Sequence, residues 1–231
     1  MSTPPSTPEP EQIVPPPPTP RRTILLIAVT VVAVLVGFVV VLRLLNRPEK
    51  IDETNLAGLP ILGDPKAPLT IFEYANFGCE HCAKVLPLVK TILARYEGKI
   101  KLVYIHYPQG EVNTRAAMAG VCAANQGKFW PFADLMFERQ TSWIKDPDPV
   151  ALWIVYAGQV EIDTNLFMKC LRSNAAERAI SQQLIMAGGS VIQSTPTFLI
   201  GDSRLVNPHF EDDFARVIDK ELNALHGSRT K

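Results

Sequence analysis

The longest apolar run of the chain covers residues 23–42, which hold no charged side chain and include eight valines. Twenty helical residues are about 30 Å long, which matches the hydrocarbon core of a bilayer. A cleaved secretory signal has a shorter apolar core followed by a small-residue cleavage site, whereas this run continues into Arg43, Leu44 and Leu45. We therefore expect a single transmembrane helix at residues 23–45.

The pattern changes abruptly on both sides of this run. Residues 1–22 contain nine of the 20 prolines and few apolar side chains, so they cannot bury enough surface to offset the entropy of ordering, and a disordered tail is expected. Residues 46–66 are rich in polar residues, glycine and proline, which predicts a linker. Residues 67–231 are long enough to form one domain with a sizeable core.

The start of this domain alternates between strand and helix patterns. Apolar runs at residues 69–77 and 100–107, each limited by proline or glycine, predict two buried strands. Between them, residues 82–96 place apolar side chains at helical spacing. A strand, a helix and a strand with short connections predict a βαβ unit with parallel pairing.

A long helical pattern then separates this unit from the last strands. Residues at about 111–190 follow the helical period with several breaks, and Asp163 is placed to cap one of these helices. Short strands at residues 197–200 and 204–206 and a helix at 210–225 complete the pattern. The fold class expected is α/β with a helical insertion, preceded by one transmembrane helix.

Charge and cysteine content narrow the class of protein. The chain has 23 Lys+Arg and 23 Asp+Glu, and this balance argues against a nucleic-acid partner, because such proteins concentrate cations to neutralise phosphates. Four cysteines are too few for a scaffold held together mainly by disulfides.

The candidate chemistry lies at Cys79-Glu80-His81-Cys82, where the first predicted strand passes into the helix. Unpaired amide donors and the positive end of the helix dipole stabilise a thiolate at Cys79. Stabilising the thiolate stabilises the reduced form, which makes the disulfide more oxidising. Cys82, one turn further on, is expected to be the resolving thiol. His81 adds a hydrogen bond or partial positive charge, whereas Glu80 adds an opposing negative charge.

The same two cysteines also fit half of a zinc site. Closing such a site needs two further ligands, but the sequence has no second C-x-x-C motif, and Cys122 and Cys170 are isolated. We therefore favour a redox pair with no metal and no cofactor. A copper or zinc metallochaperone that binds through Cys79, Cys82 and a histidine remains as the alternative from another class.

Three segments carry a resemblance to a known family. Residues 70–82 (TIFEYANFGCEHC), 126–130 (QGKFW) and 194–198 (STPTF) resemble the DsbA-like thiol:disulfide oxidoreductases of the thioredoxin superfamily, in that family's order and spacing. The resemblance implies a thioredoxin fold with a helical insertion. It also implies that Cys79 is the nucleophile, that Cys82 is its partner, and that Thr195 and Pro196 form a cis-proline loop that binds substrate.

The resemblance implies two further assignments. Glu73 matches a buried acidic position, where a raised pKa would let it relay the proton of Cys82; a salt-bridged structural glutamate is the alternative. Cys122 and Cys170 match positions where some members of the family carry a second, structural disulfide, and two buried free thiols are the alternative.

The function expected is that of a membrane-tethered thiol:disulfide oxidoreductase, specifically a dithiol oxidase that introduces disulfides into exported proteins. The residues serve a disulfide reductase or isomerase equally well. The resemblance suggests reoxidation by a quinone-linked membrane partner of the DsbB or vitamin K epoxide reductase type. Because oxidative chemistry needs an oxidising compartment, we expect a single-pass protein of the cell membrane with its catalytic domain on the extracytoplasmic side.

Overall fold

The computed structural model describes residues 20–45, 56–187 and 192–229. The chain divides into two units, residues 1–47 and 48–231. The expected tail at residues 1–19 and the first part of the expected linker, residues 46–55, lie outside the described residues.

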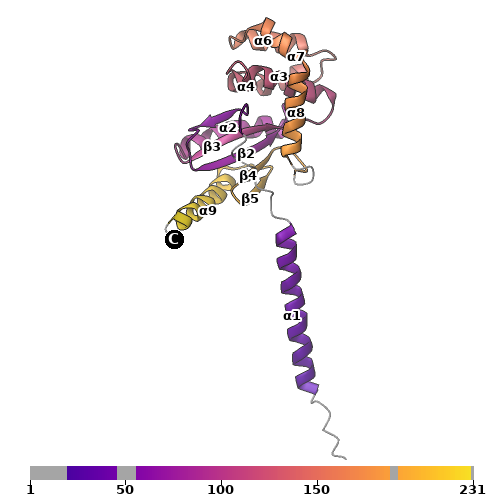
Figure 1. The fold of residues 1–231 in the computed structure, drawn as a ribbon, viewed down its shortest axis with the longest axis vertical. Coiled ribbons are helices and arrows are strands. Elements are labelled where there is room, and N and C mark those ends of the chain that lie inside the picture. The colour runs from indigo at the N-terminus through magenta and orange to yellow at the C-terminus, as the bar shows by residue number, and fades with distance from the viewer. Residues whose placement is uncertain (1–19, 46–55, 188–191, 230–231) are drawn as a thin grey trace, which may run out of the picture. The chain divides into compact units, whose positions relative to one another are not determined.

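The described part of the first unit is one helix, α1 (Pro20–Leu45), shown in indigo in Figure 1. Its segment Thr23–Leu42 has a mean hydropathy of 3.3 and is the one helix among the described residues with the length and apolar composition to cross a membrane. The side chains of this segment are exposed, so they have no protein core to pack against. The helix therefore fits a role in membrane anchoring.

The second unit is built on a five-stranded mixed sheet with the strand order β1-β3-β2-β4-β5. Its strands are β1 (Ile61–Gly63), β2 (Leu69–Ala75), β3 (Ile100–His106), β4 (Thr197–Ile200) and β5 (Ser203–Val206). The pair β2 and β3 is parallel, and the other neighbours are antiparallel. Helix α2 (Glu80–Arg95) connects the parallel pair, so the predicted βαβ unit is confirmed.

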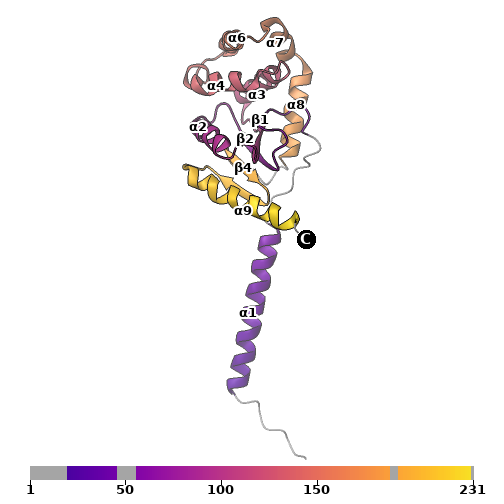
Figure 2. The same ribbon diagram turned by 90° about the vertical axis from the view of Figure 1, so that its left-hand side faces the viewer.

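Helices cover both faces of this sheet (Figures 1 and 2). One face packs against α2 and α9 (Glu211–Arg229) through an apolar cluster that includes Ile71, Val89, Ile200 and Ile218. The other face packs against residues at and after the end of α8 (Asn174–Met186), including Ala187 and Ile192. Because both faces are buried, all seven residues of β2 are buried, which explains its continuous apolar run.

The predicted helical insertion is confirmed between β3 and β4. It consists of α3 (Glu111–Ala124), α4 (Phe129–Glu138), α5 (Gln140–Trp143), α6 (Val150–Gln159), α7 (Thr164–Leu171) and α8, and in Figure 1 most of it lies beyond one end of the sheet. As predicted, Asp163 caps α7, where its side chain accepts hydrogen bonds from the backbone N–H groups of Asn165 and Leu166. A disulfide joins Cys122 on α3 to Cys170 on α7, so these two cysteines are not free thiols.

Strand β1 was not predicted and lies within the expected linker at residues 46–66. It pairs antiparallel with β3 over three residues, and the indole N–H of Trp130 on α4 donates to the carbonyl of Ile61 at 2.9 Å. Three residues are too few for an alternating pattern to be recognised. The sheet therefore begins before the boundary expected at residue 67.

The Cys122–Cys170 disulfide generates a prediction for stability. It closes a loop with a sequence separation of 48, and the chain-entropy model assigns about 4 kcal/mol to a loop of this size. Replacing both cysteines with alanine should lower the free energy of unfolding by about that amount. Urea unfolding of the full chain in detergent, followed by the fluorescence of the buried Trp143 and Trp153, measures it. Superimposable unfolding curves for the variant and the wild type would contradict the prediction.

Candidate active site

Cys79 is the N-cap residue of α2. Strand β2 ends at Ala75, and a tight turn follows in which the side chain of Asn76 accepts from the backbone N–H of Gly78 at 3.0 Å. A Cβ atom at position 78 would overlap the side chain of Asn113, so a larger residue there would require that side chain to move. The turn presents the Cys79 sulfur to the first amides of the helix.

The sulfur of Cys79 lies among hydrogen-bond donors. It accepts from the backbone N–H of Cys82 at 3.2 Å, and as a thiol it donates to the carbonyl of Thr195 at 3.3 Å. The pKa of Cys79 is lowered to about 6, and the largest cause is the hydrogen bond from the Cys82 thiol. Hydrogen bonds from the Thr195 side chain and from the backbone N–H groups of Cys82 and His81 lower this pKa further, whereas partial burial of the sulfur raises it. Cys79 is therefore a thiolate at neutral pH, and it is partly accessible.

Cys82 is placed for a different task. It is buried with 1% of its surface exposed, and burial, followed by its hydrogen bond to Cys79 and the charge of Cys79, holds its pKa far above the ordinary value. An outside disulfide cannot reach this thiol easily, whereas Cys79 lies within hydrogen-bond distance. These contrasting environments fit an attacking thiol and a resolving thiol.

Glu73 lies on β2, buried on the face of the sheet that carries α2, with 2% of its surface exposed. Burial, followed by the negative charge of Cys79, raises its pKa to about 8. Its Oε2 atom has no hydrogen-bond partner among the described residues, and the ion pairs found in the described ranges do not include it. The alternative of a salt-bridged glutamate thus has no support, and a carboxyl with a pKa near neutrality can gain or lose a proton.

The two residues between the cysteines are exposed. The carboxylate of Glu80 pairs with Lys84 at 2.6 Å, and both side chains are open to solvent, so the charge of Glu80 is screened. His81 acts on Cys79 through its backbone N–H. Its ring instead lies edge to face with that of His209, with 6.3 Å between the ring centroids.

Thr195 and Pro196 lie opposite the cysteine pair, and the peptide bond between them is cis. A groove of about 220 Å³ lies beside them. Helix α2 contributes His81, Lys84, Val85 and Leu88 to its walls, and the opposite side contributes Pro196, Asn207, Pro208 and His209. Apolar and polar side chains both line this groove, and it lies beside the cis-proline loop whose Thr195 carbonyl contacts Cys79.

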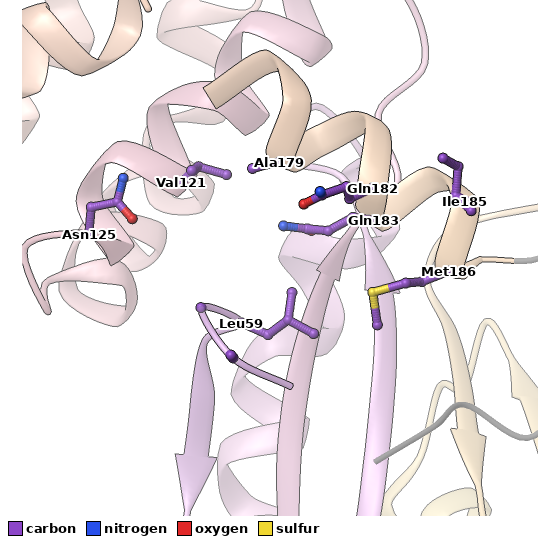
Figure 3. A pocket seen from close by; sticks show the side chains of 10 residues that line it. Leu59, Val121, Asn125, Ala179, Gln182, Gln183, Ile185 and Met186 are labelled. Atoms are coloured by element: carbon purple, nitrogen blue, oxygen red, sulfur yellow. The ribbon is translucent and has the colours of Figure 1, made fainter. Parts of the chain in front are cut away.

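A larger hollow of about 400 Å³ lies between the N-terminal side of β1 and helices α3 and α8 (Figure 3). The described residues around it are neutral, and they include Leu59, Val121, Asn125 and Met186. None of them is a cysteine, histidine or acid, so this hollow offers no group for thiol exchange. Gln183 connects its wall to β3, because the backbone N–H of His106 donates to the Gln183 side chain at 2.7 Å.

Two residues near the cysteines were not predicted from the sequence to belong to the site. Tyr104 and His106 lie on β3, are almost fully buried, and pack ring against ring with a centroid distance of 5.0 Å. Burial lowers the pKa of His106 to about 3, so the ring stays neutral. The nearly continuous apolar run of β3 hides such residues, because it indicates burial and not what lies opposite a side chain.

The geometry also bears on metal binding. Within residues 20–45, 56–187 and 192–229, no group of three or more histidine, cysteine or acidic residues is close enough together to hold a metal ion. In this part of the chain a metallochaperone would therefore have only the thiols of Cys79 and Cys82 as ligands, without a third protein ligand close by.

Comparison with known proteins supplies the family context. Residues 56–220 match the family model described as thioredoxin. The chain is 32% identical over 172 residues to the Na(+)/H(+) antiporter NhaA of Herminiimonas arsenicoxydans, a match that covers 74% of this chain and 26% of the antiporter. The chain thus spans about a quarter of the length of the first curated relatives that it matches.

Shorter relatives match over most of their length. The probable disulfide bond formation protein D of Bacillus cereus is 30% identical over 172 residues, covering 70% of this chain and 77% of that protein. The crystal structure of oxidised BdbD from Bacillus subtilis superposes with a TM-score of 0.67 at 22% identity, covering 73% of this chain and 95% of that one. The expected fold, a thioredoxin fold with a helical insertion, is confirmed.

The hydrogen bond from Cys82 generates a prediction for the pKa of Cys79. Because a donor favours the charged form, Cys82→Ala should raise that pKa from about 6 by roughly one pH unit. Cys82→Ser retains a donor and should leave it closer to the wild-type value. The rate of iodoacetamide alkylation of the reduced protein as a function of pH gives each midpoint. An alanine variant with an unchanged or lower midpoint would assign the stabilisation to other donors.

Proposed function

Because the chain belongs to the thioredoxin family, in its DsbA-like branch of thiol:disulfide oxidoreductases, we propose that it is a membrane-tethered dithiol oxidase. It would introduce disulfides into exported proteins through the Cys79–Cys82 pair. The observation that carries the proposal is the sulfur of Cys79 at the N-terminus of α2, held by the backbone N–H of Cys82 at 3.2 Å. Donors that stabilise the reduced thiolate make the corresponding disulfide more oxidising.

The first step of the reaction is attack by a substrate thiolate on the Cys79 sulfur of the Cys79–Cys82 disulfide. A bond forms between the substrate sulfur and Cys79, the Cys79–Cys82 bond breaks, and its electron pair leaves on Cys82. A buried thiolate is unstable, so Cys82 takes up a proton, and Glu73 is the nearby acid whose pKa of about 8 lets it supply one.

The second step completes the transfer. A second thiolate of the substrate attacks the substrate sulfur of the mixed disulfide, and Cys79 leaves as a thiolate. The substrate is now oxidised by two electrons, and the enzyme holds two reduced cysteines. The low pKa of Cys79 supports this step, because a more stable thiolate is a better leaving group.

Substrate binding is assigned to Thr195, Pro196 and the groove beside them. Proline provides no N–H of its own, but backbone groups of this loop lie next to Cys79, as the 3.3 Å contact from Cys79 to the Thr195 carbonyl indicates. An extended substrate segment beside its reactive cysteine would run along the groove. The proposed partners are therefore thiol-containing exported proteins.

Location and reoxidation follow from the same chemistry. The Cys122–Cys170 disulfide supports an oxidising compartment, and α1 supports attachment to a membrane. We assign the domain after α1 to the extracytoplasmic side and the N-terminal tail to the cytoplasm. A membrane-bound partner linked to quinones, of the DsbB or vitamin K epoxide reductase type, would return the cysteine pair to the disulfide.

A stoichiometric exchange experiment tests the proposal. The full chain, oxidised and purified in detergent, is mixed with a reduced, unfolded protein that contains one pair of cysteines. We expect the substrate to lose two thiols as the enzyme gains two, and Cys79→Ala to be inactive. Cys82→Ala holds no Cys79–Cys82 disulfide, so it is mixed instead with the disulfide form of the substrate. Its Cys79 thiolate should attack that disulfide, release one substrate thiol and accumulate as a mixed disulfide. The variant with alanine at both Cys122 and Cys170 is the matched control and should retain the exchange.

Two other outcomes would contradict an oxidase. If the oxidised chain leaves the substrate thiols intact while the reduced chain cleaves substrate disulfides, the protein is a reductase or isomerase. If the purified chain contains about one metal ion, keeps Cys79 and Cys82 reduced, and exchanges with neither form of the substrate, a metallochaperone replaces both.

A further inference from the structure

Two buried polar side chains lie side by side behind the cysteine pair. Glu73 on β2 and Tyr104 on β3 are direct partners in the parallel register. Residues paired in this way project to the same side of a sheet. That side faces α2 and the insertion, since Tyr104 belongs to the same apolar cluster as Cys82 and Phe129.

Both side chains carry a polar atom without a hydrogen-bond partner. Glu73 is 2% exposed and Tyr104 is 1% exposed. The Oε2 atom of Glu73 and the hydroxyl of Tyr104 are each buried and unpaired among the described residues. A buried polar group is seldom left unpaired, so two of them on neighbouring strands call for an explanation in terms of function.

The surroundings leave few other candidates to stabilise a charge on Glu73. The titratable groups that face it are Cys79 and Cys82 from α2 and Tyr104 from β3, with the neutral His106 next along the same strand. Strand β4 contributes Phe198 at the paired position. Lysine and arginine are missing from the buried residues of the described ranges. The described surroundings thus offer Glu73 a neutral donor rather than a cation.

A phenol suits this task because it can act in both protonation states of its neighbour. Its O–H donates to a carboxylate, and its oxygen accepts from a protonated carboxyl. Burial, with the nearby charges of Glu73, Cys82 and Cys79, raises the pKa of Tyr104 well above its ordinary value, so the phenol keeps its proton. A cation would hold Glu73 permanently ionised, whereas a phenol lets it alternate.

We propose that Tyr104 is a positioning residue for thiol exchange: its hydroxyl, unpaired in this structure like Oε2 of Glu73, forms a hydrogen bond to the Glu73 carboxylate once Glu73 has given its proton to Cys82. This inference rests on the proposed function and adds the group that acts on Glu73. When substrate attacks the enzyme disulfide, Glu73 gives its proton to the leaving Cys82 thiolate, and the Tyr104 hydroxyl donates to the carboxylate that results. In the reverse step Glu73 takes the proton back as Cys82 attacks Cys79.

The reverse step offers a direct readout. The reduced full chain in detergent is mixed with glutathione disulfide, which forms a mixed disulfide at Cys79. Cys82 then attacks the Cys79 sulfur, the bond to glutathione breaks, and glutathione leaves as a thiolate. Acid quenching and intact mass measurement give the rate of this collapse between pH 5 and 9. Only ionised Glu73 accepts the proton of Cys82, so the rate rises with pH.

Loss of the hydroxyl should move this pH profile in a defined direction. In the mixed disulfide Cys79 carries no charge, so the wild-type midpoint should lie somewhat below the value of about 8 found for Glu73 beside a Cys79 thiolate. Tyr104→Phe removes a donor that favours the carboxylate, which should raise the midpoint by about one pH unit, a tenfold lower rate on the acid limb. The alkylation profile of Cys79 should move much less.

A matched control separates this effect from a general loss of a buried hydroxyl. Tyr74 lies next to Glu73 on the same strand, is equally buried, and packs on the opposite face of the sheet. Tyr74→Phe should leave the midpoint of collapse unchanged. A ¹³C NMR titration of the Glu73 carboxyl in the wild type and in Tyr104→Phe provides a second measurement that does not depend on the rate of exchange.

The outcomes are distinguishable. If Glu73→Gln abolishes the pH-dependent collapse but Tyr104→Phe has the wild-type midpoint and the wild-type Glu73 titration, the role of Tyr104 is wrong and the proposed function stands. If the Tyr74 and Tyr104 variants shift equally, the effect is structural and the inference fails. If the wild type forms no mixed disulfide at Cys79, the proposed function itself fails.

Discussion

Stabilisation of the Cys79 thiolate depends on several separate parts of this domain. The sulfur of Cys79 needs donors, and they come from the first turn of α2, from the thiol of Cys82 and from the side chain of Thr195. Each donor depends on a different part of the fold: the turn after β2, the helix itself, and the cis-proline loop that precedes β4. The sheet order brings these parts together, because β4 pairs with β2 on the side away from β3.

A second constraint works on the buried side of the same pair. Cys82 is buried beside Cys79 and shielded from outside disulfides, and this burial makes its thiolate costly to form. A proton must therefore be available without bulk water. Glu73 lies on the strand that leads to Cys79, and the register places Tyr104 beside it. In the proposed mechanism, attack at the accessible Cys79 and proton exchange at the buried Cys82 thus depend on residues of two adjacent strands and one helix.

Local pattern was enough to predict much of this arrangement. Periodicity and capping rules predict strands β2 and β3 to within a few residues. They also predict the position of Cys79 at the start of a helix and the cap at Asp163. Strand β1 could not be predicted because its evidence lies in pairing with β3 and in the distant Trp130. The position of His209 beside His81 could not be predicted for the same reason, since the two residues are far apart in the sequence. The position of Tyr104 beside Glu73 depends on register, which no single segment encodes.

The redox equilibrium of the Cys79–Cys82 pair tests the central claim most directly. The fraction of oxidised full chain is measured by thiol alkylation after equilibration in a series of glutathione redox buffers. Stabilisation of the Cys79 thiolate predicts an oxidising pair with a standard potential above about −200 mV. Protein disulfide isomerase and the strongly oxidising DsbA both have potentials above this value. A potential near about −270 mV, as in thioredoxin, would contradict the account.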